Sequence, residues 1–179
     1  MNAQSELTFE VVPSGSLAAS SRQEIIDLCS AAYEEDFLYY LDLLPNPVHL
    51  LARHSGTLVS HAAWVTRWLQ IEEDRILRTA YVEAVATAPK HQRRGYASAV
   101  MQRLTRCLDG FEIGALSPSD VRFYERLGWE LWRGPLAARA KEGLLPTPGE
   151  EVMIYRLSGT PALDLNALLT VEWREGEVW

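Results

Sequence analysis

One stretch of the chain combines a basic, glycine-containing segment with a single acid inside an apolar run. It covers residues 81–104 and reads YVEAVATAPKHQRRGYASAVMQRL. A β-branched, apolar run ends at Pro89, the basic segment follows, and Val100, Met101 and Leu104 then recur at helical spacing. The pattern predicts a strand, a short loop and a helix.

The loop of this stretch has the composition of a phosphate-binding site. Backbone N–H groups in the first turn of a helix lack partners within the helix, and the helix dipole adds partial positive charge there. Gly95 permits the close approach of a diphosphate, and Ala97 is too small to obstruct it. Arg93 and Arg94 add charged donors. The alternative is an ordinary strand-to-helix turn with an arginine pair on the surface.

The spacing of Gln92, Gly95 and Ala97 resembles the pyrophosphate-binding signature of the GNAT superfamily of acyl-CoA-dependent N-acetyltransferases. It differs from a P-loop, which needs GxxxxGK followed by Ser or Thr, and from GxGxxG, because only one glycine is present. The resemblance implies acetyl-CoA as cofactor, held through its pyrophosphate by Gln92, Arg93, Arg94, Gly95, Tyr96 and Ala97. It also implies that backbone groups of Val85, Ala86 and Thr87 hold the pantetheine arm as an added strand.

Three stretches narrow the resemblance to the aminoglycoside 2'-N-acetyltransferases. They are YVEAVA before the loop, IGALS at residues 113–117 with Tyr124 and Gly128-Trp129 after it, and the tail EWREGEVW at 172–179. The tail carries most weight, because its order of acid, Trp, Arg, acid and final Trp is unusual among GNAT proteins. The resemblance implies transfer of an acetyl group to the 2'-amino group of an aminoglycoside or aminocyclitol antibiotic, by direct attack in a ternary complex. It leaves open whether the cellular role is antibiotic resistance or housekeeping.

Acetyl transfer to an amine needs a base for the amine, a donor to the carbonyl oxygen and an acid for the departing thiolate. Amines are mostly protonated near neutral pH, since the ordinary pKa of Lys is about 10.4. Glu83 is the candidate base, because a carboxylate within an apolar strand is costly without a functional partner. An outward-facing strand residue is the alternative. Tyr124 matches the tyrosine that stands near the thiolate in the superfamily and is the candidate acid; a core aromatic beside Phe123 and Leu127 is the alternative.

The resemblance also assigns an acceptor site to scattered acidic and polar positions. These are Asp36, Glu83, Ser117, Glu150, Glu151, Glu177 and the terminal carboxylate of Trp179. The indole of Trp179 could anchor the tail, and a mobile acidic tail is the alternative. Asp36 follows two further acids at the expected end of a helix, where acids are unfavourable for the dipole, so either a binding role or a solvated acidic turn fits.

The chain departs from the family between Phe37 and Val48. It reads LYYLDLLPNP there, where the family typically has a polar, acidic segment followed by a glycine pair and Met-His. One wall of the acceptor pocket is therefore expected to be more apolar, which makes a smaller aminocyclitol antibiotic a reasonable acceptor. Gly149 lies where the family can place an acid, which leaves that role to Glu150 and Glu151.

Composition restricts the class of protein. The chain has 179 residues, 47% of them hydrophobic, and nine prolines, which predicts a single globular domain over residues 1–179. A net charge of −7 disfavours nucleic acid as a partner and suits a cationic small molecule. No apolar run approaches the length of a membrane span and the start lacks a leader pattern, so we expect a cytoplasmic protein that does not enter a membrane. A homodimer is expected by resemblance alone.

Neither the cysteines nor the histidines show a metal-binding pattern. Cys29 and Cys107 fall on expected helices without CxxC spacing and are interpreted as buried thiols. The four histidines are scattered and form no HExxH motif, so no metal is expected.

The order of the expected elements is that of a mixed α/β protein. Strands are expected at 7–12, 48–54, 57–70, 76–88, 111–116, 129–133 and 152–157, the last two joined by a loop rich in Gly and Pro. Ser21 and Glu24 form a capping box that predicts the start of the first helix, and Gly128 is expected to end a short helix at 119–127. This order resembles the GNAT fold over essentially the whole chain, with a mixed sheet of about six to seven strands and about four helices.

Two other functions compete with the favoured one. The first is a GNAT enzyme that acetylates another amine, such as a polyamine or a protein N-terminus. The second is a non-catalytic module that binds acetyl-CoA. The presence of both Glu83 and Tyr124 favours catalysis over the second alternative.

Overall fold

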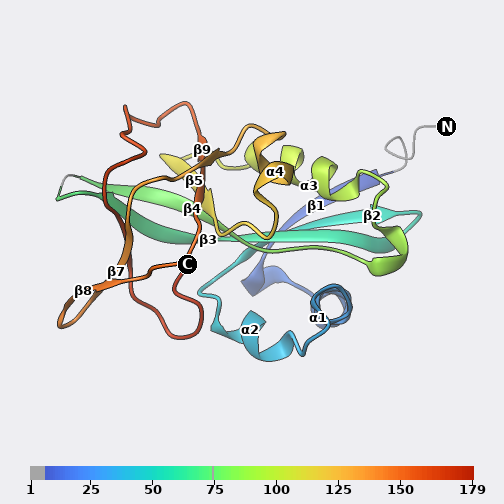
Figure 1. Ribbon diagram of the computed structural model, residues 1–179. Coiled ribbons are helices and arrows are strands. Elements are labelled where there is room, and N and C mark those ends of the chain that lie inside the picture. Colours follow the sequence, from blue (N-terminus) through green and yellow to red (C-terminus); the bar gives the residue numbers. More distant parts are fainter. Residues whose placement is uncertain (1–6, 74) are drawn as a thin grey trace. The chain divides into compact units, whose positions relative to one another are not determined.

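The computed structural model describes residues 7–73 and 75–179, which divide into two compact units (Figure 1). Unit 1 consists of the chain up to Val65 together with Val82–Cys107. Unit 2 consists of Thr66–Tyr81 and Leu108–Trp179. Strands β3 (Thr57–Ile71) and β4 (Ile76–Thr87) each contribute one half to each unit.

Unit 1 contains antiparallel strands built as the sequence predicts. Strand β1 (Leu7–Pro13) pairs with β2 (Val48–His54), and β2 pairs with the first half of β3. The predicted hairpin between β2 and β3 is confirmed. Its turn residues Ser55 and Gly56 have φ angles of 50° and 79°, which suits the two-residue turn of a hairpin. The end of β4 continues alongside β3, where Ala88 N–H donates to the Val59 carbonyl at 3.0 Å.

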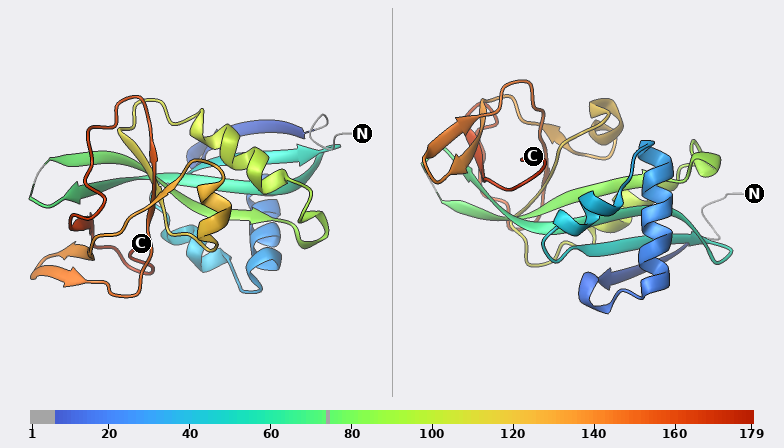
Figure 2. Two further views of the ribbon diagram at one scale, coloured as in Figure 1. Left: turned by 45° about the horizontal axis from the view of Figure 1, so that its top comes forward. Right: turned by 90° about the horizontal axis from the view of Figure 1, so that it is seen from below.

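Helices cover both faces of the strands of unit 1. Figures 1 and 2 show α1 (Ala19–Tyr33) and α2 (Leu38–Leu43) on one face and α3 (Tyr96–Thr105) on the other. Short 3-10 helices lie at Ser14–Ser16 and Pro89–His91. Helix α3 buries the predicted face of Val100, Met101 and Leu104, so the predicted strand, loop and helix at residues 81–104 are confirmed.

The predicted capping box is wrong. Helix α1 begins at Ala19, before Ser21, and its N-cap residue Ala18 makes no side-chain capping bond. The carboxylate of Glu24 instead accepts two hydrogen bonds from Arg53 on β2, at 3.0 Å and 2.6 Å. A bidentate pair with an arginine is stronger than a single bond to a backbone N–H, which explains why this acid faces the sheet.

Unit 2 contains a mixed sheet. Its strand order is β6-β9-β5-β4-β3-β10-β7-β8, in which β4 pairs with β5 and β10 with β7 in parallel. The elements are β5 (Ile113–Leu116), α4 (Val121–Glu125), β6 (Glu130–Leu131), β7 (Leu136–Ala140), β8 (Gly143–Pro146), β9 (Met153–Arg156) and β10 (Leu169–Glu172). The mixed α/β class that the sequence predicts is therefore confirmed.

The strand count is higher than predicted, with ten strands in the described residues. The segment expected to be a loop rich in Gly and Pro holds the β7–β8 hairpin, and β10 precedes the tail. Strand β7 is paired with β10, with Leu136 opposite Leu169, so its partner lies far along the chain. The local pattern LAARA does not alternate like a strand, and it forms one through its pairing with β10 together with the hairpin to β8. Cys107, expected on a helix and buried, lies after the end of α3 and is half-buried.

A buried arginine organises the tail of unit 2. Only 1% of Arg67 is exposed, and its guanidinium donates to the carbonyls of Glu172 and Val178, each at 2.6 Å. Its Nε also donates to the Glu172 carboxylate at 3.0 Å. Because every partner lies in the tail, these bonds fix residues 172–178 against β3.

A buried histidine pair joins three strands of unit 1. His61 on β3 has its Nδ1 atom 2.9 Å from the Ala84 carbonyl on β4, and a carbonyl only accepts, so Nδ1 carries the proton. The other ring nitrogen of His61 then accepts from Nδ1 of His49 on β2, at 3.0 Å. The Cys29 thiol on α1 lies 3.8 Å from His61, and burial raises the pKa of this thiol to about 12.

Burial keeps both imidazoles neutral. It lowers the pKa of His49 from its ordinary value to about 4, with a further contribution from the charge of Arg22. It lowers the pKa of His61 to about 3, assisted by His49 and opposed by the bond to Ala84. Between these values and about 6.5, the unfolded chain binds protons that the folded chain does not.

This difference predicts acid sensitivity of the folded state. As the pH falls below about 6.5, each imidazole lowers the free energy of unfolding by up to about 1.4 kcal/mol per pH unit. Thermal unfolding followed by circular dichroism from neutral pH to about pH 4.5 measures this slope. The double variant His49→Gln/His61→Gln should show a shallower slope, and His54→Gln, on the same strand as His49, should keep that of the wild type. Equal slopes in all three proteins would contradict the prediction.

Candidate active site

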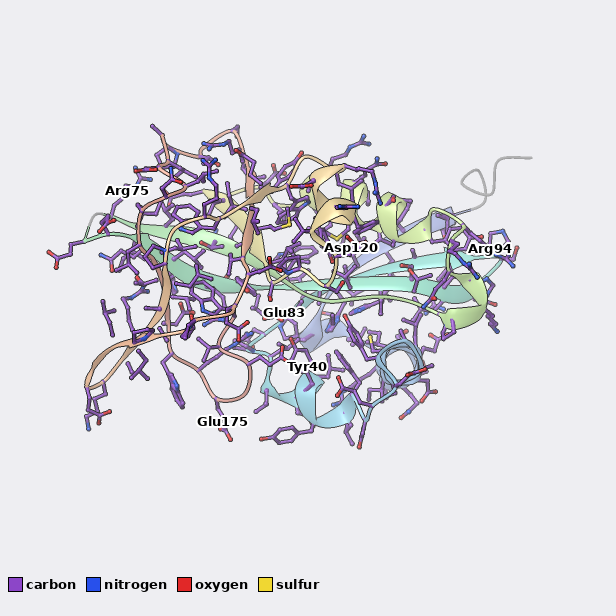
Figure 3. All side chains as sticks on the ribbon, viewed as in Figure 1. Tyr40, Arg75, Glu83, Arg94, Asp120 and Glu175 are labelled. Carbon is purple, nitrogen blue, oxygen red and sulfur yellow. The ribbon has the colours of Figure 1, made fainter. Side chains whose placement is uncertain are left out.

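Glu83 lies buried on β4 with a specific partner. It is 5% exposed, and its Oε2 atom accepts a hydrogen bond from the Tyr40 hydroxyl on α2. Figure 3 shows the two side chains next to each other, from α2 and β4. A carboxylate this deeply buried requires hydrogen-bond partners, so the interpretation as an outward-facing strand residue is wrong.

The backbone next to Glu83 departs from regular strand geometry. Ala84 has a φ of 54°, which is in the left-handed region and costs a non-glycine residue about 1–3 kcal/mol. Side chains of unit 1 donate to the carbonyls that follow. The Tyr33 hydroxyl bonds Val85 O at 2.8 Å, and Ser60 Oγ bonds Ala86 O at 2.9 Å. Together with His61 on Ala84, they hold three successive carbonyls in fixed directions.

The predicted phosphate loop contains two residues in the left-handed region of the backbone. Gly95 is the N-cap of α3 with a φ of 83°, and Arg93 is also left-handed at 59°. Left-handed residues within a turn direct successive N–H groups toward one side, where a phosphate oxygen can bind. The Gln92 amide donates to the Thr87 carbonyl at 3.3 Å, which ties the loop to the end of β4.

Side chains of the loop divide into two groups. Gln92, Arg93 and Arg94 are exposed beside the first turn of α3, and Figure 3 shows Arg94 there. Tyr96 is instead buried in the core, so its contribution to the loop is its backbone N–H. Ala97, which follows it, is half-buried. These residues fit the diphosphate of acetyl-CoA, because they combine exposed donors with the absence of a side chain at Gly95.

Tyr124 lies on α4 of unit 2 and is 4% exposed. Its ring makes edge contacts with Phe123 and Trp129, at centroid distances of 4.9 Å and 6.2 Å. Burial raises the pKa of this phenol to about 12, with a bond to Ser119 acting in the opposite direction and the charge of Asp120 in the same one. Tyr124 therefore stays protonated throughout the neutral range, which suits both a proton donor and a core aromatic.

The predicted acceptor residues divide between the two units. Asp36 belongs to unit 1 and is exposed, and its carboxylate accepts from the Leu38 N–H at 3.0 Å at the start of α2. Buried Glu83 also belongs to unit 1. Unit 2 holds the remaining five, of which Ser117, Glu150, Glu151 and Glu177 are exposed.

Trp179 is the buried member of this group. It is 3% exposed, and its indole N–H donates to the Thr147 hydroxyl at 2.7 Å. The alternative of a mobile acidic tail is therefore wrong for this side chain.

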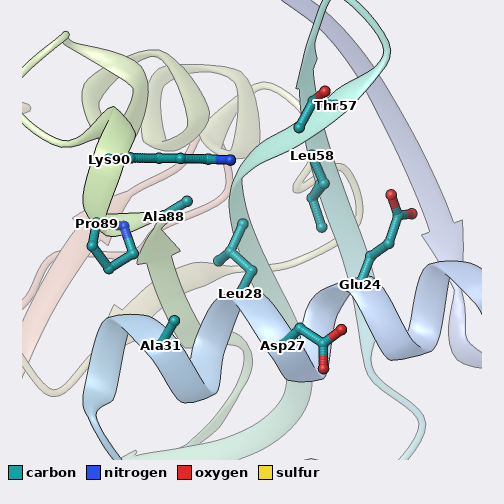
Figure 4. A pocket seen from close by; sticks show the side chains of 9 residues that line it. All are labelled: Glu24, Asp27, Leu28, Ala31, Thr57, Leu58, Ala88, Pro89 and Lys90. Carbon is teal, nitrogen blue, oxygen red and sulfur yellow. The ribbon is translucent and has the colours of Figure 1, made fainter.

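A separate pocket of ≈ 440 Å³ lies in unit 1 (Figure 4). Helix α1, the start of β3 and the segment after β4 line it, with Glu24, Asp27 and Lys90 adding charge to a largely apolar lining. None of the predicted catalytic, cofactor-binding or acceptor-binding residues lines this pocket, although Glu24 of the predicted capping box does.

Sequence reasoning missed the residues that hold β4. Tyr33, Tyr40 and His61 belong to no motif, and each lies at least 23 positions from the strand residue that it contacts. The one available signal was the aromatic content of residues 33–40, which end within the segment that departs from the family.

Among residues 7–73 and 75–179, no cluster of three or more His, Cys, Asp or Glu side chains is arranged to hold a metal ion. None of the helices in this part of the chain is both long and apolar enough to cross a membrane.

Comparison with known proteins places the chain in a family. A family model described as an acetyltransferase (GNAT) domain matches residues 16–132. An aminoglycoside 2'-N-acetyltransferase of Mycolicibacterium fortuitum is 39% identical over 139 residues, which cover 74% of this chain and 71% of that protein. The chain therefore belongs to the GNAT acetyltransferase family, and it is an acetyl-CoA-dependent N-acetyltransferase.

Solved structures show the same fold. The GNAT family N-acetyltransferase YhbS of Escherichia coli, solved with CoA, has a TM-score of 0.63 at 17% identity and covers 92% of this chain and 89% of its own. Eis1 of Mycobacterium abscessus has a TM-score of 0.60 at 20% identity. The match covers 73% of this chain but only 33% of Eis1, so this chain corresponds to a third of that protein.

The geometry of Gly95 predicts how a substitution affects acetyl-CoA. Valine at a φ of 83° is strained and places a branched side chain where the diphosphate must approach, so Gly95→Val should weaken acetyl-CoA binding about tenfold or more. Isothermal titration calorimetry with acetyl-CoA measures the dissociation constant. Gly56→Val is the matched control, because Gly56 has a φ of 79° with open space around it, in the β2–β3 turn. Unchanged affinity in Gly95→Val would show that the loop does not hold the diphosphate.

Proposed function

We propose that the protein is an aminoglycoside 2'-N-acetyltransferase that transfers acetyl from acetyl-CoA to the 2'-amino group of an aminoglycoside or aminocyclitol antibiotic. The observation that carries this proposal is the buried carboxylate of Glu83. This residue lies on β4, two residues before the segment 85–87 that is proposed to hold the pantetheine arm of acetyl-CoA. The name of the Mycolicibacterium fortuitum relative supports the choice of acceptor. The net charge of −7 favours a cationic acceptor in the same way.

Acetyl-CoA supplies an activated thioester when it is bound. Glu83 takes a proton from the acceptor amine, directly or through water, as the amine nitrogen forms its bond to the acetyl carbon. The bond from that carbon to sulfur then breaks, and the hydroxyl of Tyr124 donates its proton to the departing thiolate. The transfer is direct, with both substrates bound in one complex.

The raised pKa of Tyr124 affects how this residue can act as an acid for the thiolate. The ordinary pKa of a thiol is about 8.5, so a proton moves from Tyr124 to a free thiolate against the equilibrium. Tyr124 therefore acts first as a hydrogen-bond donor that stabilises charge on sulfur, and solvent restores the proton it gives up. The same pKa ensures that every enzyme molecule carries the donor at neutral pH.

Acetyl-CoA is assigned to unit 1. The backbone of Val85, Ala86 and Thr87 holds the pantetheine arm, and the carbonyls of Val85 and Ala86 keep a second lone pair beside their bonds to Tyr33 and Ser60. The diphosphate binds at Gln92, Arg93, Arg94, Gly95, Tyr96 and Ala97.

The proposed ligands of the acceptor follow from the resemblance in sequence. The proposed ligands are Asp36, Glu83, Ser117, Glu150, Glu151, Glu177 and Trp179. Helix α2 exposes the apolar side chain of Leu38 close to the exposed carboxylate of Asp36. This part of the proposed acceptor site therefore combines a negative charge with apolar surface. This mixture favours a compact aminocyclitol over a larger and more highly charged aminoglycoside.

The proposal extends to the organisation of the protein. Residues 1–179 form one catalytic domain, which the match of the family model across both units supports. We further propose a cytoplasmic homodimer with antibiotic resistance as its cellular role.

A second candidate is a GNAT enzyme that acetylates a polyamine or a protein N-terminus. The apolar exposure of α2 favours it, because the family's acidic segment is absent there.

Replacing Asp36 and Glu177 by amides distinguishes the antibiotic from another amine as the acceptor. A large rise in KM for aminoglycosides supports the antibiotic, and an unchanged KM supports another amine.

A matched pair of antibiotics tests the position of acetylation. Kanamycin B has an amino group at the 2' position, whereas kanamycin A has a hydroxyl there. We expect thiol release from acetyl-CoA with kanamycin B and little with kanamycin A, with a product that NMR assigns as 2'-acetylated. Equal turnover of both compounds would place the reaction at another amine. Turnover of neither, with acetyl-CoA still bound, would remove the antibiotic from the proposal.

Substitution of the two catalytic residues separates an enzyme from a binding module. Glu83→Gln should lower kcat about a hundredfold and Tyr124→Phe about tenfold, with little change in acetyl-CoA affinity. Because the Tyr124 phenol loses its proton only near pH 12, kcat should not fall between about pH 8 and pH 10. A wild-type rate in Glu83→Gln would exclude this residue as the base. A loss of activity with a midpoint near pH 9 would exclude Tyr124 as the protonated donor.

A further inference from the structure

Tyr40 connects α2 to the proposed base. Its hydroxyl donates to Oε2 of Glu83, and its ring packs against Phe37 at a centroid distance of 4.8 Å. Phe37 is buried and stacks in turn on Tyr33 at 5.3 Å, with an interplanar angle of 11°. This row of three aromatic rings fixes the position of the Tyr40 hydroxyl independently of Glu83.

The same neighbourhood fixes the backbone that carries Glu83. Tyr33, at the other end of the aromatic row, bonds the Val85 carbonyl at 2.8 Å. His61 bonds the carbonyl of left-handed Ala84 at 2.9 Å. With the following backbone held at two carbonyls, the freedom that remains to Glu83 is rotation of its own side chain, and Tyr40 removes it.

Fixing one carboxylate oxygen fixes the direction of the lone pairs on both. A base that must meet an amine proton works best when its lone pair points along the approach, and a misplacement of about 1 Å can cost about a hundredfold in rate. A phenol with a rigid ring is suited to this role, because it donates one hydrogen bond and contributes no charge that would oppose a cationic acceptor.

We propose that Tyr40 is a positioning residue for acetyl transfer, which holds the Glu83 carboxylate in the orientation that receives the amine proton. The proposal rests on the assignment of Glu83 as the base in the proposed function. It gives the segment that departs from the family a catalytic purpose, since α2 supplies the donor. The competing interpretation is a block, in which the Tyr40 hydroxyl occupies Glu83 and must leave before the amine can bind.

Tyr40→Phe tests the proposal, because it removes the hydroxyl and keeps the ring that packs on Phe37. With acetyl-CoA and kanamycin B, or the best acceptor of an amine panel, we expect kcat to fall about tenfold, as for a lost hydrogen bond to a charged group. The KM values for acetyl-CoA and acceptor, and the thermal unfolding midpoint, should stay close to the wild type. Tyr155→Phe is the matched control, because it removes a tyrosine hydroxyl from β9 in unit 2 and should leave kcat unchanged.

A double variant distinguishes positioning from a general structural effect. If Tyr40 acts through Glu83, adding Tyr40→Phe to Glu83→Gln should lower kcat no further, although each single variant is impaired. Additive losses would show that Tyr40 acts elsewhere and would overturn the proposal. A rise in kcat for Tyr40→Phe would establish the block instead.

The outcomes also separate this proposal from the one on which it rests. A Glu83→Gln variant with wild-type kcat removes the base, and the proposal on Tyr40 with it. An impaired Glu83→Gln variant beside an unimpaired Tyr40→Phe variant leaves the proposed function intact and overturns the positioning role alone.

Discussion

The hydrogen bond from His61 to the Ala84 carbonyl is the constraint on which the candidate site of unit 1 depends. Ala84 adopts a left-handed conformation in the middle of β4, which is costly for alanine and survives only where its surroundings impose it. A buried imidazole meets that requirement because its proton is fixed by a second imidazole behind it. The strained residue separates the proposed base, Glu83, from the residues proposed to hold acetyl-CoA.

Each unit solves the burial of a polar group in a similar way. In unit 1 the histidine pair stays neutral and bonds a strand carbonyl, whereas in unit 2 the charged Arg67 satisfies its donors on two carbonyls and a carboxylate. Breaking such a network leaves an unpaired polar group, which costs more than the bond itself contributes. The histidine pair and Arg67 therefore also stabilise the folded chain, so a substitution at His49, His61 or Arg67 is expected to lower stability.

The distribution of charge suits two substrates of opposite sign. The chain is acidic as a whole, yet its phosphate loop joins Arg93 and Arg94 to the positive end of α3. The proposed acceptor ligands include five acidic side chains. In the proposed function the anionic diphosphate and the cationic amine bind to different sets of residues, and the hydroxyl of Tyr40 adds no charge beside Glu83.

Local patterns in the sequence determined the elements and the chemistry that depends on neighbours along the chain. The spacing of apolar residues and the turn residues predicted the β2–β3 hairpin, and the strand, loop and helix at residues 81–104. Backbone geometry in these segments follows from the residue types within a few positions. The spacing of Gln92, Gly95 and Ala97 likewise indicated the family. Only the tertiary structure decided that Glu24 pairs with Arg53 instead of capping α1, and that LAARA becomes a strand beside β10. It also decided that Tyr33, Tyr40 and His61 converge on β4, because contacts between distant residues arise from packing, which no local pattern encodes.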